Sequence, residues 1–140
     1  NNVKWRVYNE RTLILANNRQ WGLYRNKKLD MAKLLQKENR HKQAIHTFFE
    51  ICYLDLNGCR NMPQGLSQKE LKEFKINDFD PKTAFLAPGI ISMLKDSIEE
   101  SSTKASELKK QFIDICNKTK PLQDMPISSE NAWKTLEKEL

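Results

Sequence analysis

The stretch that decides the fold, residues 29–56, reads LDMAKLLQKENRHKQAIHTFFEICYLDL. It contains two runs with the apolar spacing of amphipathic helices, joined by a short polar break. Ala32 and Ala44 are small residues at positions where two antiparallel helices would touch. Leu35 and Phe48 are larger side chains that would fill the space beside them. The stretch therefore predicts a helical hairpin whose second helix, apolar around much of its girth, is central in the fold.

The remainder of the chain favours helices as well. Only four Gly and five Pro occur in 140 residues, and Val is rare, which disfavours a sheet of many strands. Residues that favour helices, such as Lys, Leu, Glu and Ala, are plentiful. We therefore predict an all-α fold, an irregular bundle of about six or seven helices with a repeat-like antiparallel helix pair. At this length the bundle is expected to be a single domain over residues 1–140.

Two segments depart from the helical pattern. Residues 1–18 begin with VKWRVY, in which apolar and charged residues alternate, so we expect an irregular arm there that leads into a helix over about Tyr8–Ala16. Residues 118–128 contain two prolines and are expected to form a linker. A last short helix, capped by Ser129, is expected to follow this linker.

Several residues mark the expected ends of helices. Gly58 is a typical residue just beyond a helix C-terminus. Ser67 and Glu70 have the spacing of a capping box, in which each side chain accepts a hydrogen bond from the other residue's backbone N–H. Asp80 followed by Pro81 indicates the start of a further helix, because proline's missing N–H costs nothing at the first helical position.

The hairpin at residues 29–56 resembles a single, degenerate tetratricopeptide repeat. Ala32 and Ala44 match the small residues of that family's two helices, and Phe48 matches the aromatic residue that follows. The pattern departs at Lys28, where the family has an aromatic residue, and its closing proline is absent. No second copy follows at the roughly 34-residue period of the family. The resemblance implies a peptide-binding groove, and the alternative is an ordinary helical hairpin with none.

The positive charge of the chain is concentrated in its first third. Residues 1–43 hold eleven Lys or Arg and three Asp or Glu, a balance of 11 − 3 = +8, whereas residues 44–140 hold thirteen and fifteen, a balance of 13 − 15 = −2. Such asymmetry indicates either a surface for nucleic acid or another acidic partner, or a basic region that meets the acidic remainder of the chain.

The best local candidate for a contact site is a basic and aromatic segment that precedes the hairpin. Cations can reach phosphates or carboxylates, and aromatic rings can stack on bases or on a partner's side chains. The candidate partner-binding residues are Arg19, Trp21, Tyr24, Arg25, Lys27 and Lys28. Trp21 and Tyr24 lie three residues apart on one helix face, so packing into the core is the competing interpretation.

No catalytic, cofactor or metal site is predicted. Cys52 lies in the most apolar helix, where burial suppresses thiol reactivity, and Cys59 and Cys116 form no CxxC pair with it. His41 and His46 point about 140° apart around a helix. The odd number of cysteines favours a reducing, cytoplasmic setting. No apolar run approaches the ~18 residues of a membrane span.

These patterns favour a non-enzymatic helical scaffold or protein-interaction module with a protein partner. The alternative is a nucleic-acid-binding helical protein that uses the basic first third. A small enzyme or ligand-binding bundle would require His41, His46 or Cys52 to line a cavity. The position of the basic side chains on the folded surface discriminates between the first two, because one contiguous basic face favours an anionic partner.

Overall fold

The computed structural model describes residues 2–62, 65–73 and 84–140, and all regular structure in these ranges is helical. The α-helices are α1 (Asn2–Asn17), α2 (Trp21–Lys37), α3 (His41–Leu56), α4 (Gln68–Glu73), α5 (Pro88–Ser101), α6 (Ala105–Lys118) and α7 (Ser129–Glu137), and the 3-10 turns are η1 (Cys59–Asn61) and η4 (Lys120–Leu122). With seven α-helices in the described residues, the predicted all-α, irregular bundle is confirmed.

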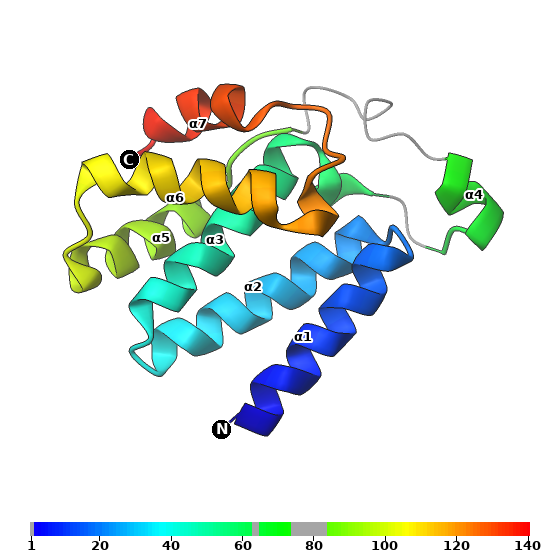
Figure 1. Cartoon of the computed structure of the whole chain (residues 1–140), viewed down its shortest axis with the longest axis horizontal. Helices are drawn as coiled ribbons and strands as arrows, with labels where there is room; N and C mark the ends of the chain where they lie inside the picture. The colour runs from blue at the N-terminus through cyan, green and yellow to red at the C-terminus, as the bar shows by residue number, and fades with distance from the viewer. Residues whose placement is uncertain (1, 63–64, 74–83) are drawn as a thin grey trace.

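Helix α3 is the centre of the bundle (Figure 1). It packs against α2 on one side and against α5, α6 and α7 on the other, whereas α1 packs against α2. Helices α1, α2 and α3 therefore form a row with α2 in the middle, and α4 lies apart at one end of the molecule (Figure 1). None of the helices in the described ranges is both long enough and apolar enough to cross a bilayer.

The α2–α3 hairpin forms as the sequence predicts. Ala32, Ala44 and Phe48 are each 0% exposed, and Leu35 is also buried. The two helices lie antiparallel along their length (Figure 1) and share the most extensive contact between any two described elements. Small residues let the two backbones approach closely, and the large side chains fill the remaining space.

The same turn connects α1 to α2 and α2 to α3. Arg19 and Asn39 each adopt a left-handed conformation, with φ of 59° and 62°. The next residues, Gln20 and Arg40, donate their backbone N–H groups to carbonyls five residues back, at 2.9 Å in both turns, and each then serves as the N-cap of the following helix. This is the Schellman arrangement of a helix C-terminus. Its use in both connections makes the three-helix row regular.

The prediction of an irregular arm at the N-terminus was wrong, because α1 is helical from Asn2. The alternation in VKWRVY suggested a period of two residues. The period that determines the structure instead runs through Trp5, Tyr8, Thr12 and Ala16, which share one face of the helix. Thr12 and Ala16 are buried on this face, and packing against α2 outweighs the local β-like pattern.

Helices α5, α6 and α7 form a second layer against α3. Aromatic side chains and the linker at 118–128 hold this layer to α3. Phe112 on α6 contacts Phe49 and Tyr53 on α3, with ring centroids 5.4 and 6.1 Å apart. The linker at 118–128 is packed rather than free: Leu122 is fully buried, and the Ile127 carbonyl accepts a hydrogen bond from the Tyr53 hydroxyl.

The helix-end predictions hold with one shift. Ser67 Oγ accepts from the Glu70 N–H, and Glu70 Oε1 accepts from the Ser67 N–H, both at 3.2 Å. Gly58 follows α3 with φ of 85°. The cap of α7 is Ser128, whose hydroxyl accepts from the Asn131 N–H, and not Ser129 as predicted. The predicted start at Asp80 and Pro81 lies outside the described residues.

Candidate functional site

The six candidate residues of the basic, aromatic segment do not form one exposed patch. Trp21, Tyr24 and Arg25 are 7%, 2% and 8% exposed, and Trp21 packs edge-on against Tyr24 with ring centroids 5.6 Å apart. The competing interpretation of these two aromatics as core residues is thus the one that the structure supports. Lys27 and Lys28 are half-buried, and Arg19 is exposed in the α1–α2 turn.

Arg25 is bound to the end of α3. Its Nε and Nη2 donate to the two carboxylate oxygens of Asp55 at 2.9 and 3.1 Å. Arg60 donates to the same carboxylate at 2.7 Å. The Asp55 side chain is 1% exposed, so two arginines compensate a fully buried negative charge. One basic residue of the predicted contact segment therefore has a structural partner inside the protein.

A second buried carboxylate, Glu50, lies further along the same helix. Its side chain is 3% exposed, accepts from the Tyr24 hydroxyl at 3.0 Å, and lies 3.4 Å from Lys28 Nζ. His46 Nδ1, one turn earlier on α3, lies 3.2 Å from it. Burial together with the Glu50 charge raises the pKa of Tyr24, so the hydroxyl remains a donor.

Burial alone would raise the pKa of Glu50, but the hydrogen bond from His46, the charges of Lys28 and His46, and the Tyr24 hydrogen bond more than offset it. The net effect lowers this pKa below its ordinary value of 4.5. A depressed carboxyl pKa contributes stability above the pKa of the unfolded chain, and that contribution is lost as pH falls through the folded pKa.

We therefore expect Glu50→Gln to lower the free energy of unfolding at neutral pH. The difference in this free energy between variant and wild type should become smaller as the pH falls below 4.5. Urea unfolding at a series of pH values measures this difference. Glu100→Gln, at an exposed position on α5, is the control and should follow the wild-type pH profile. A Glu50→Gln profile that stays parallel to wild type down to strongly acidic pH would contradict the assignment.

A groove runs between α1 and α3 with α2 beneath it, and it is named here the α1–α3 groove. Its volume is about 780 Å³. Trp5 and Leu13 line it from α1, and Met31 and Leu35 line it from α2. The position of the groove follows from the fold, because α1 and α3 flank α2 in the three-helix row (Figure 1). The groove therefore offers apolar surface along its floor.

Charged side chains line the same groove. Arg6, Arg40 and Lys42 supply positive charge, and Glu10 and the already paired Glu50 supply negative charge. The Arg40 guanidinium lies 5.3 Å from the centroid of the Trp5 ring, which positions it over the apolar lining. The positive charge in excess of the carboxylates thus comes from Arg6 on α1 and from Arg40 and Lys42 at the start of α3.

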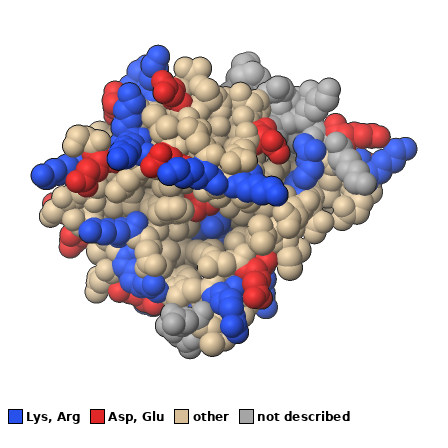
Figure 2. Space-filling view, in the orientation of Figure 1, with Lys and Arg blue, Asp and Glu red and all other residues tan. Residues whose placement is uncertain are grey.

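Several basic side chains of the first third are held in ion pairs. Arg25 and Lys28 pair with carboxylates of α3, and Lys4 pairs with Glu38 at 3.0 Å. On the face shown in Figure 2, Lys and Arg side chains are interspersed with Asp and Glu side chains. The α3 carboxylates Asp55 and Glu50 therefore offset two of the positive charges of residues 1–43, those of Arg25 and Lys28, within the protein.

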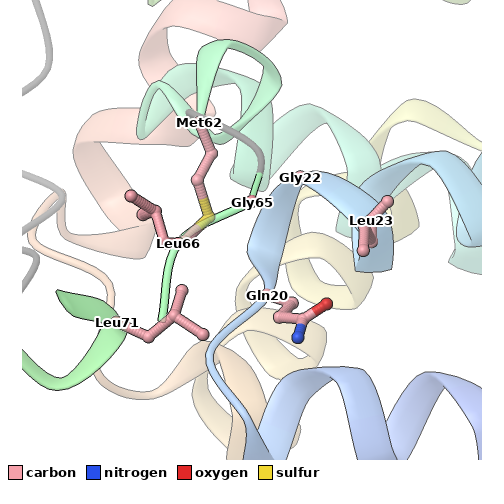
Figure 3. Close-up of a pocket in the computed structure, with 7 residues that line it drawn as sticks. All are labelled: Gln20, Gly22, Leu23, Met62, Gly65, Leu66 and Leu71. Atoms are coloured by element: carbon pink, nitrogen blue, oxygen red, sulfur yellow. The ribbon is translucent and has the colours of Figure 1, made fainter. Parts of the chain in front are cut away.

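A smaller pocket of about 180 Å³ lies near the start of α2. Met62, Leu66 and Leu71 line one side of it, and Gln20 and Leu23 line the α2 side (Figure 3). None of its lining residues is charged. It offers only apolar contacts and one amide, which gives little to orient a ligand.

The cysteines and histidines do not form a cluster of reactive groups. Burial, followed by the Asp55 charge, raises the pKa of Cys52 and Cys59, and burial with the Glu50 charge raises that of Cys116 to about 12. These thiols are therefore protonated and poorly nucleophilic at neutral pH. Among the described residues, no three His, Cys, Asp or Glu side chains gather as a metal site.

The two histidines have different environments. His41 Nδ1 lies 3.1 Å from Ser97 Oγ, which joins the start of α3 to α5. His46 is 55% exposed and lines the α1–α3 groove beside Glu50. Of the three residues that an enzyme or ligand-binding bundle was expected to need, only His46 lines a described cavity, since Cys52 is fully buried.

The groove residues Trp5, Arg6, Arg40 and Lys42 were not predicted as a site. Trp5 and Arg6 lie in the segment expected to be irregular, so no helix face was assigned to them.

Comparisons of the chain with protein-family models, with curated proteins and with solved structures found no match.

Proposed function

We propose that this chain is a non-enzymatic protein-interaction module whose α1–α3 groove holds a segment of a protein partner. The observation that carries the proposal is the groove itself, which combines an apolar floor with charged sides. Binding sites for peptides commonly pair apolar contact, which supplies affinity, with charged groups that supply specificity and orientation. The buried, protonated thiols support a binding function over nucleophilic catalysis.

The repeated turn supports the resemblance to a tetratricopeptide repeat as part of this proposal. Helical repeats stack through equivalent connections, and their concave surface is the usual binding surface. Here the two Schellman turns at Arg19 and Asn39 align three helices so that α1 and α3 border one groove. The groove is thus a proposed counterpart of a repeat protein's concave surface, built from a single row of helices.

The alternative, nucleic-acid binding through the first third, has less support from the described residues. A nucleic-acid surface requires positive charge that follows the phosphate backbone. Arg25 and Lys28 are instead paired with buried carboxylates, and Glu10 lies within the groove.

The test uses the double variant Arg40→Glu with Lys42→Glu. Both side chains line the groove. Arg40 is the N-cap of α3 and Lys42 lies in its first turn, where negative charge favours a helix, so the fold should tolerate the change. We expect retention of a protein partner from cell extract to fall about tenfold or more, because two favourable charges become repulsive. Amide hydrogen exchange of the purified complex should show protection in α1 and α3.

The matched control is Lys33→Glu with Lys109→Glu, which makes the same total change of charge at two other positions. Both lysines are exposed, and neither lines this groove or the other described pockets near it. The control should retain the partner as wild type does. Equal loss in both variants, or protection outside α1 and α3, would overturn the proposal. Retention of nuclease-sensitive material that disappears at high salt would favour the nucleic-acid alternative.

A further inference from the structure

We propose that the segment bound in the α1–α3 groove is acidic and extended, and that it continues over the edge of α3 into a second groove between α3 and α6. This inference rests on the proposed function and specifies the class of partner and the path that it takes. It follows from the second groove, from the residues that the two grooves share, and from the balance of charge along them.

The second groove, named here the α3–α6 groove, has a volume of about 420 Å³. Its apolar lining is formed by Ile45 from α3 and Ile115 from α6, both largely buried. Gln111 and Thr103 contribute polar groups at its side. Like the first groove, it therefore combines an apolar base with hydrogen-bonding groups.

Lys42 and His46 line both grooves. They lie four residues apart, so they occupy the same side of α3 in successive turns. The remaining α3 residues of the two grooves fall on opposite flanks of this pair, with Gln43 and Thr47 toward α1 and Ile45 toward α6. The two grooves thus meet at one ridge of α3.

Along this path, positive side chains outnumber negative ones once the ion pairs are set aside. Glu50 is compensated by Lys28 and His46, and Asp114 in the second groove lies 3.8 Å from Lys118. Arg6, Arg40 and Lys42 remain against the single carboxylate of Glu10. The ridge residue Lys42 therefore faces both grooves without a carboxylate partner among the described residues, and an acidic segment complements this distribution.

The path favours an extended segment over a helix. An α-helix with its side chains is a straight rod about 10–12 Å in diameter, which fits along one groove. An extended chain advances about 3.3 Å per residue, so a few residues span a ridge and contact the grooves on both sides of it. Because its side chains alternate between two faces, every second side chain can face the apolar lining of the grooves. Alternation of acidic and apolar residues matches this geometry.

The test uses fluorescent synthetic peptides and fluorescence anisotropy. The main probe alternates Glu with Leu and is long enough to reach both grooves. A half-length version, a version with Lys for each Glu, and a version with Ser for each Leu serve as comparisons. We expect the full-length acidic peptide to bind, the Lys version not to bind, and the Ser version to bind about tenfold or more weakly.

The variant Gln111→Glu places a negative charge in the second groove alone, and Ser106→Glu is the control at an exposed position on the same helix, outside both grooves. Gln111→Glu should weaken binding of the full-length acidic peptide about tenfold and leave binding of the half-length peptide unchanged. Lys42→Glu should weaken binding of both peptides, because the residue at position 42 lines both grooves.

Equal effects of Gln111→Glu and Ser106→Glu on the full-length peptide would overturn the path over α3. Equal binding of the Glu and Lys peptides, or no binding of the Glu peptide, would overturn the acidic class. If the Arg40 and Lys42 double variant still loses the protein partner in either case, the proposed function stands without this inference. If the partner is also retained by that variant, both fall.

Discussion

Replacing Asp55 with alanine is expected to lower the free energy of unfolding by about 3–5 kcal/mol, because it leaves buried cations without a counter-ion. Arg25 makes a two-pronged contact with this carboxylate, and Arg60 adds a third hydrogen bond at 2.7 Å. The Arg25 side chain is only 10% exposed, so water cannot replace what is lost. Urea unfolding of wild type and variant measures the difference.

A matched control separates the loss of the buried ion pair from the loss of a negative charge in general. Asp30→Ala removes the same side chain at an exposed position on α2, and it should change the free energy of unfolding by less than about 0.5 kcal/mol. Adding Arg25→Met to the Asp55 variant should recover part of the loss, since an apolar side chain is then left where a charge was stranded. Similar losses for Asp55→Ala and Asp30→Ala would contradict this explanation.

The Asp55 contact also fixes the geometry on which the groove depends. It joins the first turns of α2 to the last turn of α3, whereas the tight turn at Asn39 joins the opposite ends of the same helices. The hairpin is therefore held at both ends. Met31 and Leu35 of α2 form the floor of the α1–α3 groove, and Lys42 of α3 lies at one side of it. A rigid hairpin therefore keeps the floor and this side of the groove in a fixed position relative to each other.

The hairpin itself was predictable because its signals are local. Small residues at Ala32 and Ala44, large residues beside them and a polar break between them are all contained in 28 residues. The capping box at Ser67 and Glu70 was predictable for the same reason, since its two hydrogen bonds join residues three apart. Local signals of this kind do not depend on how the rest of the chain folds.

The buried carboxylates were not predicted, because their partners are distant in sequence. Glu50 bonds Tyr24 across 26 positions, and Asp55 bonds Arg25 across 30. A signal was nevertheless present: both acidic residues interrupt the apolar run FFEICYLDL in a helix predicted to be central. A carboxylate buried in such a helix requires cationic partners. The basic segment supplies two of these cations, Arg25 and Lys28.

The groove was missed for a different physical reason. Its α1 side includes Trp5 and Arg6, and the alternating pattern around them hid a helical period of three to four residues. A groove between helices also depends on how neighbouring helices are placed, which no single segment specifies. The charge asymmetry indicated an anionic partner or an internal acidic complement, and the structure shows that the internal complement accounts for Arg25 and Lys28.

The second large effect is expected in the other layer, where Phe112→Ala should lower the free energy of unfolding by about 3–5 kcal/mol. Phe112 is fully buried, and its ring lies 5.4 Å from that of Phe49 on α3 and 5.7 Å from that of Trp133 on α7. Truncation removes the side chain that joins three helices and leaves a cavity that neighbouring aromatic rings cannot fill by small shifts.

The same variant tests whether the chain unfolds as the single domain predicted for residues 1–140. If α6 and α7 belong to one cooperative unit with α3, Phe112→Ala should shift a single urea transition to lower concentration without changing its slope. Phe85→Ala is the control, since that ring is 49% exposed over Arg60 and should contribute less than about 1 kcal/mol. Two separated transitions in the Phe112 variant, with the α2–α3 hairpin retained in the first, would show instead that the α5–α7 layer folds as an independent unit.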